Sequence, residues 1–372
     1  MKSCFCYVVA SLQILLAPCS SDDLEGSAAS QPKARDPWTQ PYQKNSIWNQ
    51  PIGSAAEYVP VELMPTKGAG IDVKFFLELD ANDPVRQTIG FDRFAPPEGR
   101  CAGTTDMKGL TVRLPDGWMV PDIGPENPFG RTPNSSFVFL MPDRKTAWIG
   151  PAIARCDPTG PLYMFSFQRF ENNRKYDDMR GDGVEGTGGQ GASAMSGLGG
   201  TIRLGELTGE EPIRHAIKIN PWGRHLFYSD ELPGFRWPAK AADQYANEEG
   251  HKNRYVGEDP NLVMGTLLTI PPDVTAEDLG LESEPAKKLF FTLQNYGAYI
   301  TEDAGWDVLD FIIERGVEVE FEEHWGFSME SEQWAKDVVR LASRFHAVTN
   351  NEPESIGGGG EPLQPLAPDL IQ

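Results

Sequence analysis

The stretch FVFLMPDRKTAWIGPAIA, residues 137–154, contains the pattern that indicates the fold class. Residues 137–141 form a continuous apolar run that ends at Pro142-Asp143, a dipeptide typical of turns. A second apolar run, residues 147–154, follows directly. Short apolar runs between turn residues are typical of buried strands, so this stretch predicts two of them.

Strand patterns recur on both sides of this stretch. Apolar residues alternate over 71–77 and again over 110–114, where the pattern ends at the turn Pro115-Asp116-Gly117. Further strands are predicted at 162–170, 214–219, 263–270 and 317–321. Strands and helices do not alternate regularly, and no repeat of fixed period is evident. We therefore predict a mainly β fold of β-sandwich or jelly-roll-like type with a few helices.

The helices are expected late in the chain. Residues 285–297 have apolar side chains at helical spacing, and residues 331–348 carry a longer apolar stripe that begins at Trp334. We expect the second segment to be the longest helix. The tail, residues 351–372, is rich in Gly and Pro and is predicted to be disordered.

Length and charge limit the class of protein. The chain has 372 residues, of which 40% are hydrophobic, and a net charge of −21. We predict a single mainly β domain over residues 45–350. The acidity argues against nucleic acid and against an anionic membrane surface as partners, because both attract basic proteins. Solubility alone is sufficient to explain it.

The N-terminus predicts export. A short basic start precedes an apolar run over residues 4–17 that is too short to span a bilayer. Residues 16–19, Leu-Ala-Pro-Cys, are similar to a bacterial lipoprotein signal in which Cys19 is lipidated. Pro18 stands where a small residue is expected, which leaves ordinary cleavage open. We expect a signal peptide over 1–19, a flexible tether over 20–44, and a secreted or lipid-anchored envelope protein that meets a membrane only through the anchor. The sequence does not determine the oligomeric state.

Export leaves two cysteines in the folded part. If the N-terminus is a lipoprotein signal, Cys4 and Cys6 leave with it and Cys19 is acylated. An even pair in an oxidising compartment is most simply one disulfide, here between Cys101 and Cys156. The alternative, a metal pair, lacks any CxxC spacing.

The functional site is predicted in residues 176–215, YDDMRGDGVEGTGGQGASAMSGLGGTIRLGELTGEEPIRH. Long irregular loops are often functional, and glycine lets the backbone approach a ligand closely. The carboxylates at the start of the stretch are candidate calcium ligands: Asp177, Asp178, Asp182 and Glu185. Their spacing differs from that of an EF-hand, and a solvated turn is the alternative. Asp178 and Asp182 are also candidate catalytic carboxylates.

His215 is the second candidate in this stretch. It shares a strand face with Ile217 and Ile219, so it is either a buried core histidine or a base in a concave face. Arg203 and Glu206 lie just upstream and offer a guanidinium and a carboxylate. Pairing of these two residues on the surface is the alternative.

Two later segments carry further candidates. Aromatic residues gather in the loop-rich stretch 222–245, where rings suit sugar faces and polar neighbours suit hydroxyls. The candidate substrate-binding residues there are Trp222, Arg236, Trp237 and Tyr245. Tyr299 and Asp303 follow Gly297 in a turn and are candidate catalytic residues. Packing of the rings in the loop is the alternative for the aromatic set.

The chain resembles a known group of proteins in five motifs. These are GDG at 181–183, ASAMSGLGG at 192–200, IRHAI at 213–217, FRWPA at 235–239 and YGAYITED at 296–303. They are similar to those of a broad group of largely uncharacterised secreted bacterial β-sandwich proteins associated with polysaccharides. The resemblance covers about residues 45–315 and implies a β-sandwich fold and a glycan partner. It assigns no catalytic residues.

These observations favour an exported carbohydrate-active enzyme that cleaves a polysaccharide or oligosaccharide. A hydrolase needs two carboxylates, for which the candidates are Asp178, Asp182, Glu206 and Asp303. A lyase needs a cation and a proton carrier, for which the candidates are Arg203, His215 and Tyr299. Hydrolysis is slightly favoured, and no cofactor is required apart from a candidate structural calcium ion. The alternatives are a non-catalytic surface glycan-binding lipoprotein and a calcium-stabilised structural envelope protein.

Overall fold

The computed structural model describes residues 34–63, 67–124, 133–166, 175–184, 188–229 and 234–371. The chain divides into two compact units, Met1–Lys33 and Ala34–Gln372, and only the second is described below. The predicted signal peptide, Cys19 and residues 20–33 of the predicted tether lie outside the described residues. Within the described helices, none is both long and apolar enough to cross a membrane.

The mainly β class is confirmed, with 26% of residues in strands and 15% in helices. The strands are β1 (Tyr58–Pro60), β2 (Ala69–Glu78), β3 (Val85–Phe91), β4 (Thr105–Arg113), β5 (Phe137–Leu140), β6 (Thr146–Gly150), β7 (Ile153–Ala154), β8 (Leu162–Phe165), β9 (Lys175–Asp178), β10 (Gly189–Gln190), β11 (Met195–Ser196), β12 (Ile217–Asn220), β13 (Leu267–Thr269), β14 (Ala298–Ile300), β15 (Leu309–Glu314) and β16 (His346–Val348). The helices are α1 (Gly223–Leu226), α2 (Ala276–Leu279), α3 (Glu284–Asn295), α4 (Val317–Trp325) and α5 (Glu332–Ala342), with 3₁₀ turns η1 (Arg100–Ala102) and η2 (Ile356–Gly358).

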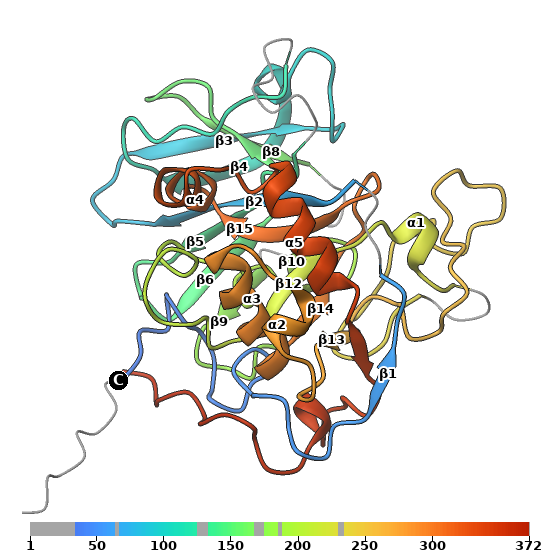
Figure 1. Cartoon of the computed structure of the whole chain (residues 1–372). Helices are drawn as coiled ribbons and strands as arrows, with labels where there is room; N and C mark the ends of the chain where they lie inside the picture. Colours follow the sequence, from blue (N-terminus) through green and yellow to red (C-terminus); the bar gives the residue numbers. More distant parts are fainter. Residues whose placement is uncertain are drawn as a thin grey trace, which may run out of the picture. The chain divides into compact units, whose positions relative to one another are not determined.

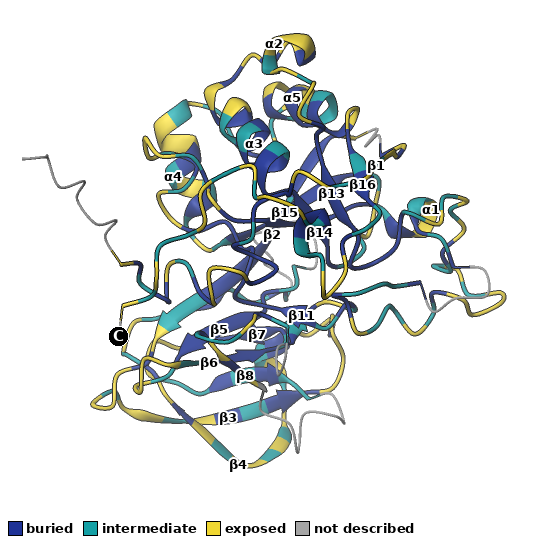
Figure 2. Ribbon diagram, turned by 90° about the horizontal axis from the view of Figure 1, so that it is seen from below, coloured by how far each residue is buried: buried dark blue, intermediate teal, exposed yellow. Residues whose placement is uncertain are grey.

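A large mixed sheet forms the centre of the unit, in the order β1-β16-β13-β14-β12-β15-β2-β5-β6-β9. Its middle strands are parallel in the pairs β12/β14, β15/β2 and β2/β5, whereas β12 and β15 are antiparallel. Helices α3, α4 and α5 lie on one face of this sheet (Figures 1 and 2). Their core contact centres on Trp334 of α5, whose ring lies 6.2 Å from that of Phe311 in β15.

A second sheet, β4-β3-β8-β7, packs against another part of the large sheet. Phe75, Phe137 and Trp148 from the large sheet share one buried cluster with side chains of β4, β7 and β8. The large sheet is therefore covered by helices over one region and by a second sheet over another.

The opposite face of the middle strands is polar and buried. Lys74 and Lys218 are fully buried there. The ammonium group of Lys218 donates to the carbonyl oxygens of Ser196 and Gly197 at 3.1 and 3.0 Å. The glycine-rich loop of residues 188–200 thus covers this face and satisfies a buried cation, which a strand of apolar side chains cannot do.

Two element predictions are wrong. Residues 317–321 form the start of helix α4 and not a strand, because buried Val317 and Phe321 are four residues apart and so share a helical face as well. The segment 331–348 is helical only as far as Ala342, and residues 346–348 form strand β16. Among the described residues, the longest helix is consequently α3, with 12 residues, against 11 in α5.

The two ends of the unit are hydrogen-bonded to each other, which corrects the predicted domain limits. The amide of Arg35 donates to Asp369 O at 3.0 Å, and that of Leu363 donates to Ile52 O at 2.9 Å. The Arg35 guanidinium also donates to Pro368 O at 2.6 Å. The tail to residue 371 is therefore ordered despite its Gly and Pro content, and the compact unit begins at residue 34 instead of 45.

Candidate functional site

A cavity of about 310 Å³ opens at one edge of the large sheet. Among the described residues, four carboxylate side chains line it: Asp72, Glu302, Asp303 and Asp310. Four aromatic side chains also line it: Phe94, Trp222, Tyr245 and Trp306. Carboxylates between aromatic rings are suited to a ligand with hydroxyl groups and apolar faces, as in a sugar.

The strand directions explain why these residues meet. The chain leaves β12 and β14 at this edge, while β15, β2 and β5 begin near it. Asn220 ends β12 and pairs with Asp310 in β15, and residues 302–303 follow β14. Asp72 lies near the start of β2, and Asn134 comes just before β5. The reversal between β12 and β15 therefore places side chains that lie on or next to five strands around one cavity.

Asn134 joins two of the carboxylates. Its amide nitrogen donates to Asp72 Oδ2 at 3.2 Å and to Glu302 Oε2 at 3.1 Å. Gln190, from the glycine-rich loop, reaches the same Glu302 oxygen at 3.5 Å. The adjacent Gly191 has φ +43°, and a Cβ there would lie 2.5 Å from Glu302 Cδ. Glycine is thus required for the loop to pass this close to the carboxylate.

The two joined carboxyl groups differ in their electrostatic surroundings. Burial raises the pKa of Glu302 well above its usual value, and the nearby Asp72 raises it further. Burial lowers the pKa of Lys74, while Asp72 and Glu302 act in the opposite direction. The Lys74 ammonium group donates to Ser136 Oγ at 2.6 Å. Burial thus favours a protonated Glu302 beside the Asp72 carboxyl group.

A second pair of acids lies beside the first. Tyr245 Oη donates to the two oxygens of Asp303 at 3.3 and 3.2 Å, and Tyr255 Oη donates to Asp243 Oδ2 at 2.6 Å. Asp243 and Asp303 are also hydrogen-bonded to each other. Burial and the Asp243 carboxylate raise the pKa of Asp303 to about 7. This pair therefore shares a proton near neutral pH.

Three of the predicted site residues line the cavity, namely Asp303, Trp222 and Tyr245. The prediction missed Asp72, Asn134, Glu302 and Asp310. Glu302 stands next to the predicted Asp303 and was recognisable from that position. Asp72 and Asp310 lie inside strands, where a polar residue in an alternating pattern normally indicates solvent exposure. No sequence signal marked Asn134.

The candidates His215, Glu206 and Arg203 lie outside this cavity. The ring of His215 is buried, with Nε2 2.9 Å from Glu206 Oε1 and Nδ1 2.9 Å from Ala216 O. Both ring nitrogens of His215 thus have partners within the protein. The Arg203 guanidinium donates to Glu314 Oε2 at 2.6 Å, and only its backbone amide donates to Glu206, also at 2.6 Å. The side chains of Arg203 and Glu206 therefore bind other parts of the scaffold and do not form an ion pair with each other.

Three further candidates also have scaffold partners. Tyr299 is fully buried and packs edge-on against Trp48 at 5.4 Å. Arg236 donates to Thr349 O at 2.8 Å. Trp237 is only partly buried but packs against the main core. None of the three lines the cavity.

The candidate calcium ligands do not converge among the described residues. Asp177 is buried and accepts from Tyr42 and Ser196, whereas its neighbour Asp178 is exposed and accepts from the Arg180 amide. Asp182 accepts from the Val184 amide, and Glu185 lies outside the described residues. Neighbouring strand residues point to opposite faces, so Asp177 and Asp178 cannot bind one ion together. A structural calcium ion in this loop stays a prediction.

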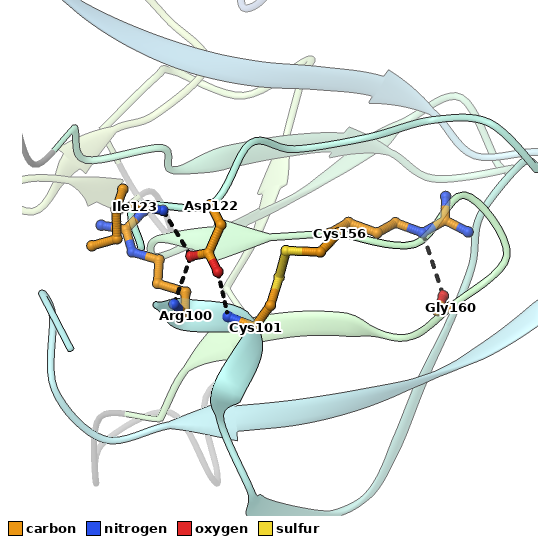
Figure 3. Close-up of a disulfide and its surroundings, with 7 residues drawn as sticks. Arg100, Cys101, Asp122, Ile123, Cys156 and Gly160 are labelled. Carbon is orange, nitrogen blue, oxygen red and sulfur yellow. Dashed lines mark hydrogen bonds between the residues drawn. A yellow bond between two sulfur atoms is a disulfide. The ribbon is translucent and has the colours of Figure 1, made fainter. Parts of the chain in front are cut away.

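The predicted disulfide between Cys101 and Cys156 is confirmed (Figure 3). The carboxylate of Asp122 lies beside it and accepts from the amides of Arg100, Cys101 and Ile123 at 2.6, 3.2 and 2.7 Å. Within the described residues, these two sulfurs and Asp122 form the one group of metal-type ligands close enough to share an ion. Because the sulfurs are bonded to each other, the group is a structural crosslink.

Comparison with known proteins adds no assignment. No protein-family model, no curated protein and no solved structure matches this chain. Fold and site together define a mainly β protein with a carboxylate-rich, aromatic-walled cavity.

Proposed function

We propose that this protein is an exported carbohydrate-active enzyme that hydrolyses a glycosidic bond, with Glu302 as the acid and Asp72 as the nucleophile. The observation that carries the proposal is the bridge by Asn134, which holds these two carboxyl groups side by side in the cavity. Glycoside hydrolysis requires such a pair, one group protonated and the other ionised.

The spacing favours a double displacement with retention of configuration. One nitrogen bonds Asp72 Oδ2 at 3.2 Å and Glu302 Oε2 at 3.1 Å, so these two oxygens lie at most about 6.3 Å apart. Retaining hydrolases have carboxyl groups about 5–5.5 Å apart, whereas inverting enzymes need about 6.5–9.5 Å to admit a water molecule. The bound on the two bridged oxygens is compatible with the closer, retaining arrangement, which we adopt.

The proposed chemistry gives each carboxyl group one role. Glu302 gives its proton to the glycosidic oxygen as the bond to the anomeric carbon breaks, and the Asp72 carboxylate bonds to that carbon. The Glu302 carboxylate then takes a proton from water, whose oxygen attacks the same carbon and releases Asp72. Lys74 stabilises the Asp72 carboxylate when it is free. Trp222, Trp306 and Tyr245 supply ring faces for the sugar.

The lining favours hydrolysis over elimination. A lyase must neutralise the carboxylate of a uronic acid, yet four acidic side chains line the cavity and Arg224 is the single Lys or Arg among its described lining residues. The lyase candidates Arg203, His215 and Tyr299 all have scaffold contacts elsewhere. A neutral glycan is the substrate that this charge distribution favours.

The remaining parts of the proposal concern location and architecture. Export, with lipidation at Cys19 or cleavage without it, fits a disulfide that persists in an oxidising compartment. We also propose that β2, β5 and β6 with the four-stranded sheet are a β-sandwich region, consistent with the secreted proteins that the sequence resembles. A polysaccharide is the proposed partner.

The test is a panel of xylan, laminarin, starch, chitosan, pectin and alginate, assayed together for new reducing ends and for absorbance of unsaturated products. We expect reducing ends alone, and Glu302→Gln or Asp72→Asn should lower kcat by at least about 100-fold. Asp178→Asn, on an exposed carboxylate, is the matched control and should retain the wild-type rate. Unsaturated products would indicate a lyase.

Retention on a glycan without turnover would favour the glycan-binding alternative, for which the aromatic walls are the supporting observation. In that case Trp222→Ala should weaken binding while Glu302→Gln leaves it intact. Absence of both binding and turnover would favour a structural envelope protein.

A further inference from the structure

The two loops that form one side of the cavity are held by a single buried residue outside it. Phe94 and Pro133 both line the cavity. Arg100, which is fully buried, donates from Nε to Phe94 O at 3.3 Å and from Nη2 to Pro133 O at 2.8 Å. Its guanidinium also lies 5.0 Å from the centre of the Phe94 ring. One planar group thus fixes two separate loops.

This contact reaches the carboxyl pair through the chain. Pro133 directly precedes Asn134, whose amide joins Asp72 and Glu302. Phe94 is 39% exposed and lines the cavity. Disorder in either loop would therefore change both the wall that meets the ligand and the position of the bridging amide.

Arg100 is itself anchored from the other direction. It begins η1, where its amide donates to Asp122 Oδ1 at 2.6 Å, and the next residue is bonded to Cys156 (Figure 3). Burial lowers the pKa of Arg100 to about 10, which leaves it charged at neutral pH. The disulfide and the Asp122 carboxylate therefore fix the backbone from which the guanidinium extends.

We propose that Arg100 is a positioning residue for the substrate, which orders the Phe94 and Pro133 rim of the cavity through one guanidinium and is itself held by the Cys101–Cys156 disulfide. This inference rests on the proposed function for the identity of the ligand, but the ordering of the rim is independent of it. A lysine cannot replace this arginine, because it lacks the fork that bonds two carbonyl oxygens at once.

Arg155 provides a matched control on the other half of the disulfide. It is also fully buried, precedes Cys156, and donates to Pro115 O, Trp118 O and Pro158 O at 2.8, 2.7 and 2.9 Å. None of these acceptors lines the cavity. Arg100→Met and Arg155→Met should thus destabilise the same region of the fold, whereas only the first should alter the rim.

The experiment compares both variants and Arg100→Lys with the full-length wild type. On the panel polysaccharide that the wild type cleaves fastest, Arg100→Met should raise KM about tenfold with a smaller change in kcat, and Arg155→Met should keep the wild-type KM. The KM of Arg100→Lys should lie between the KM values of Arg100→Met and Arg155→Met. An equal rise of KM in both methionine variants would overturn the proposal.

Hydrogen exchange of the unliganded proteins tests the rim without a substrate. Amides of residues 92–95 and 134–136 should exchange at least about tenfold faster in Arg100→Met than in Arg155→Met. Equal exchange would overturn the proposal. If no panel glycan is cleaved by the wild type, the proposed function fails, and the exchange comparison still decides whether Arg100 orders the rim.

Discussion

Replacing Asp303 by asparagine should make the protein more stable at alkaline pH. The pKa of this carboxyl rises from 3.8 to about 7 because it is buried beside Asp243. Between these values the folded protein keeps a proton that the unfolded chain has released. The free energy of unfolding therefore falls as the pH rises from about 4 to about 7, and it stays lowered above that range.

The magnitude follows from the size of this shift. Three pH units correspond to about 4 kcal/mol for an isolated group. Asp303 is partly exposed at the cavity and shares its proton with Asp243, so water and the partner should halve this to about 2 kcal/mol. The substitution also suits the local hydrogen bonds, since an asparagine side chain keeps an acceptor for Tyr245 and gains a donor for Asp243.

The assay is urea unfolding of wild type and Asp303→Asn at pH 4, 6 and 8, followed by tryptophan fluorescence. The variant should match the wild type at pH 4 and exceed it by about 2 kcal/mol at pH 8. Asp178→Asn, on an exposed carboxylate, should change stability by less than about 0.5 kcal/mol at each pH. A difference between wild type and Asp303→Asn that does not vary with pH would refute the reasoning.

Three further predictions concern other parts of the molecule. His215→Ala should lower the free energy of unfolding by about 3 kcal/mol at pH 5.5 but keep the wild-type turnover. The Glu206 partner raises the pKa of His215, so the stabilisation by this pair is complete below pH 6.5 and is lost as the pH rises through the folded-state pKa. A tenfold rate loss in a folded variant would restore His215 as a catalytic candidate. Replacing both Cys101 and Cys156 by serine should lower the unfolding free energy by about 4 kcal/mol, because the bond joins residues separated by 55 positions. An unchanged midpoint of urea unfolding would contradict this. Gly191→Ala should lower the free energy of unfolding by about 1–3 kcal/mol and displace Glu302, with at least about tenfold loss of turnover. Gly205 also has a positive φ, but a Cβ there meets open space, so Gly205→Ala should keep its activity. Equal rates in the two variants would count against the close approach of the loop to Glu302.

Local chemistry along the chain determined the fold class and the crosslink. The strands β2, β5, β6 and β8 follow from apolar runs and alternation, because side-chain period and turn residues act within a few positions. The disulfide was predicted from the two cysteines that lie outside the predicted signal peptide and lipidation site. Residues 317–321 show the limit of such reasoning, since an alternating segment whose apolar residues are also four apart fits a helix equally well.

Tertiary structure alone decided the site. Asn134 lies 62 residues from Asp72 and 168 residues from Glu302, yet its amide contacts both. That contact depends on β12, β15, β2 and β5 being neighbours in an order different from their order in the chain. Periodicity reports which face of a strand is buried, but it contains no information about which strands pair. The carboxyl groups of the cavity therefore converge for reasons that only the folded sheet contains.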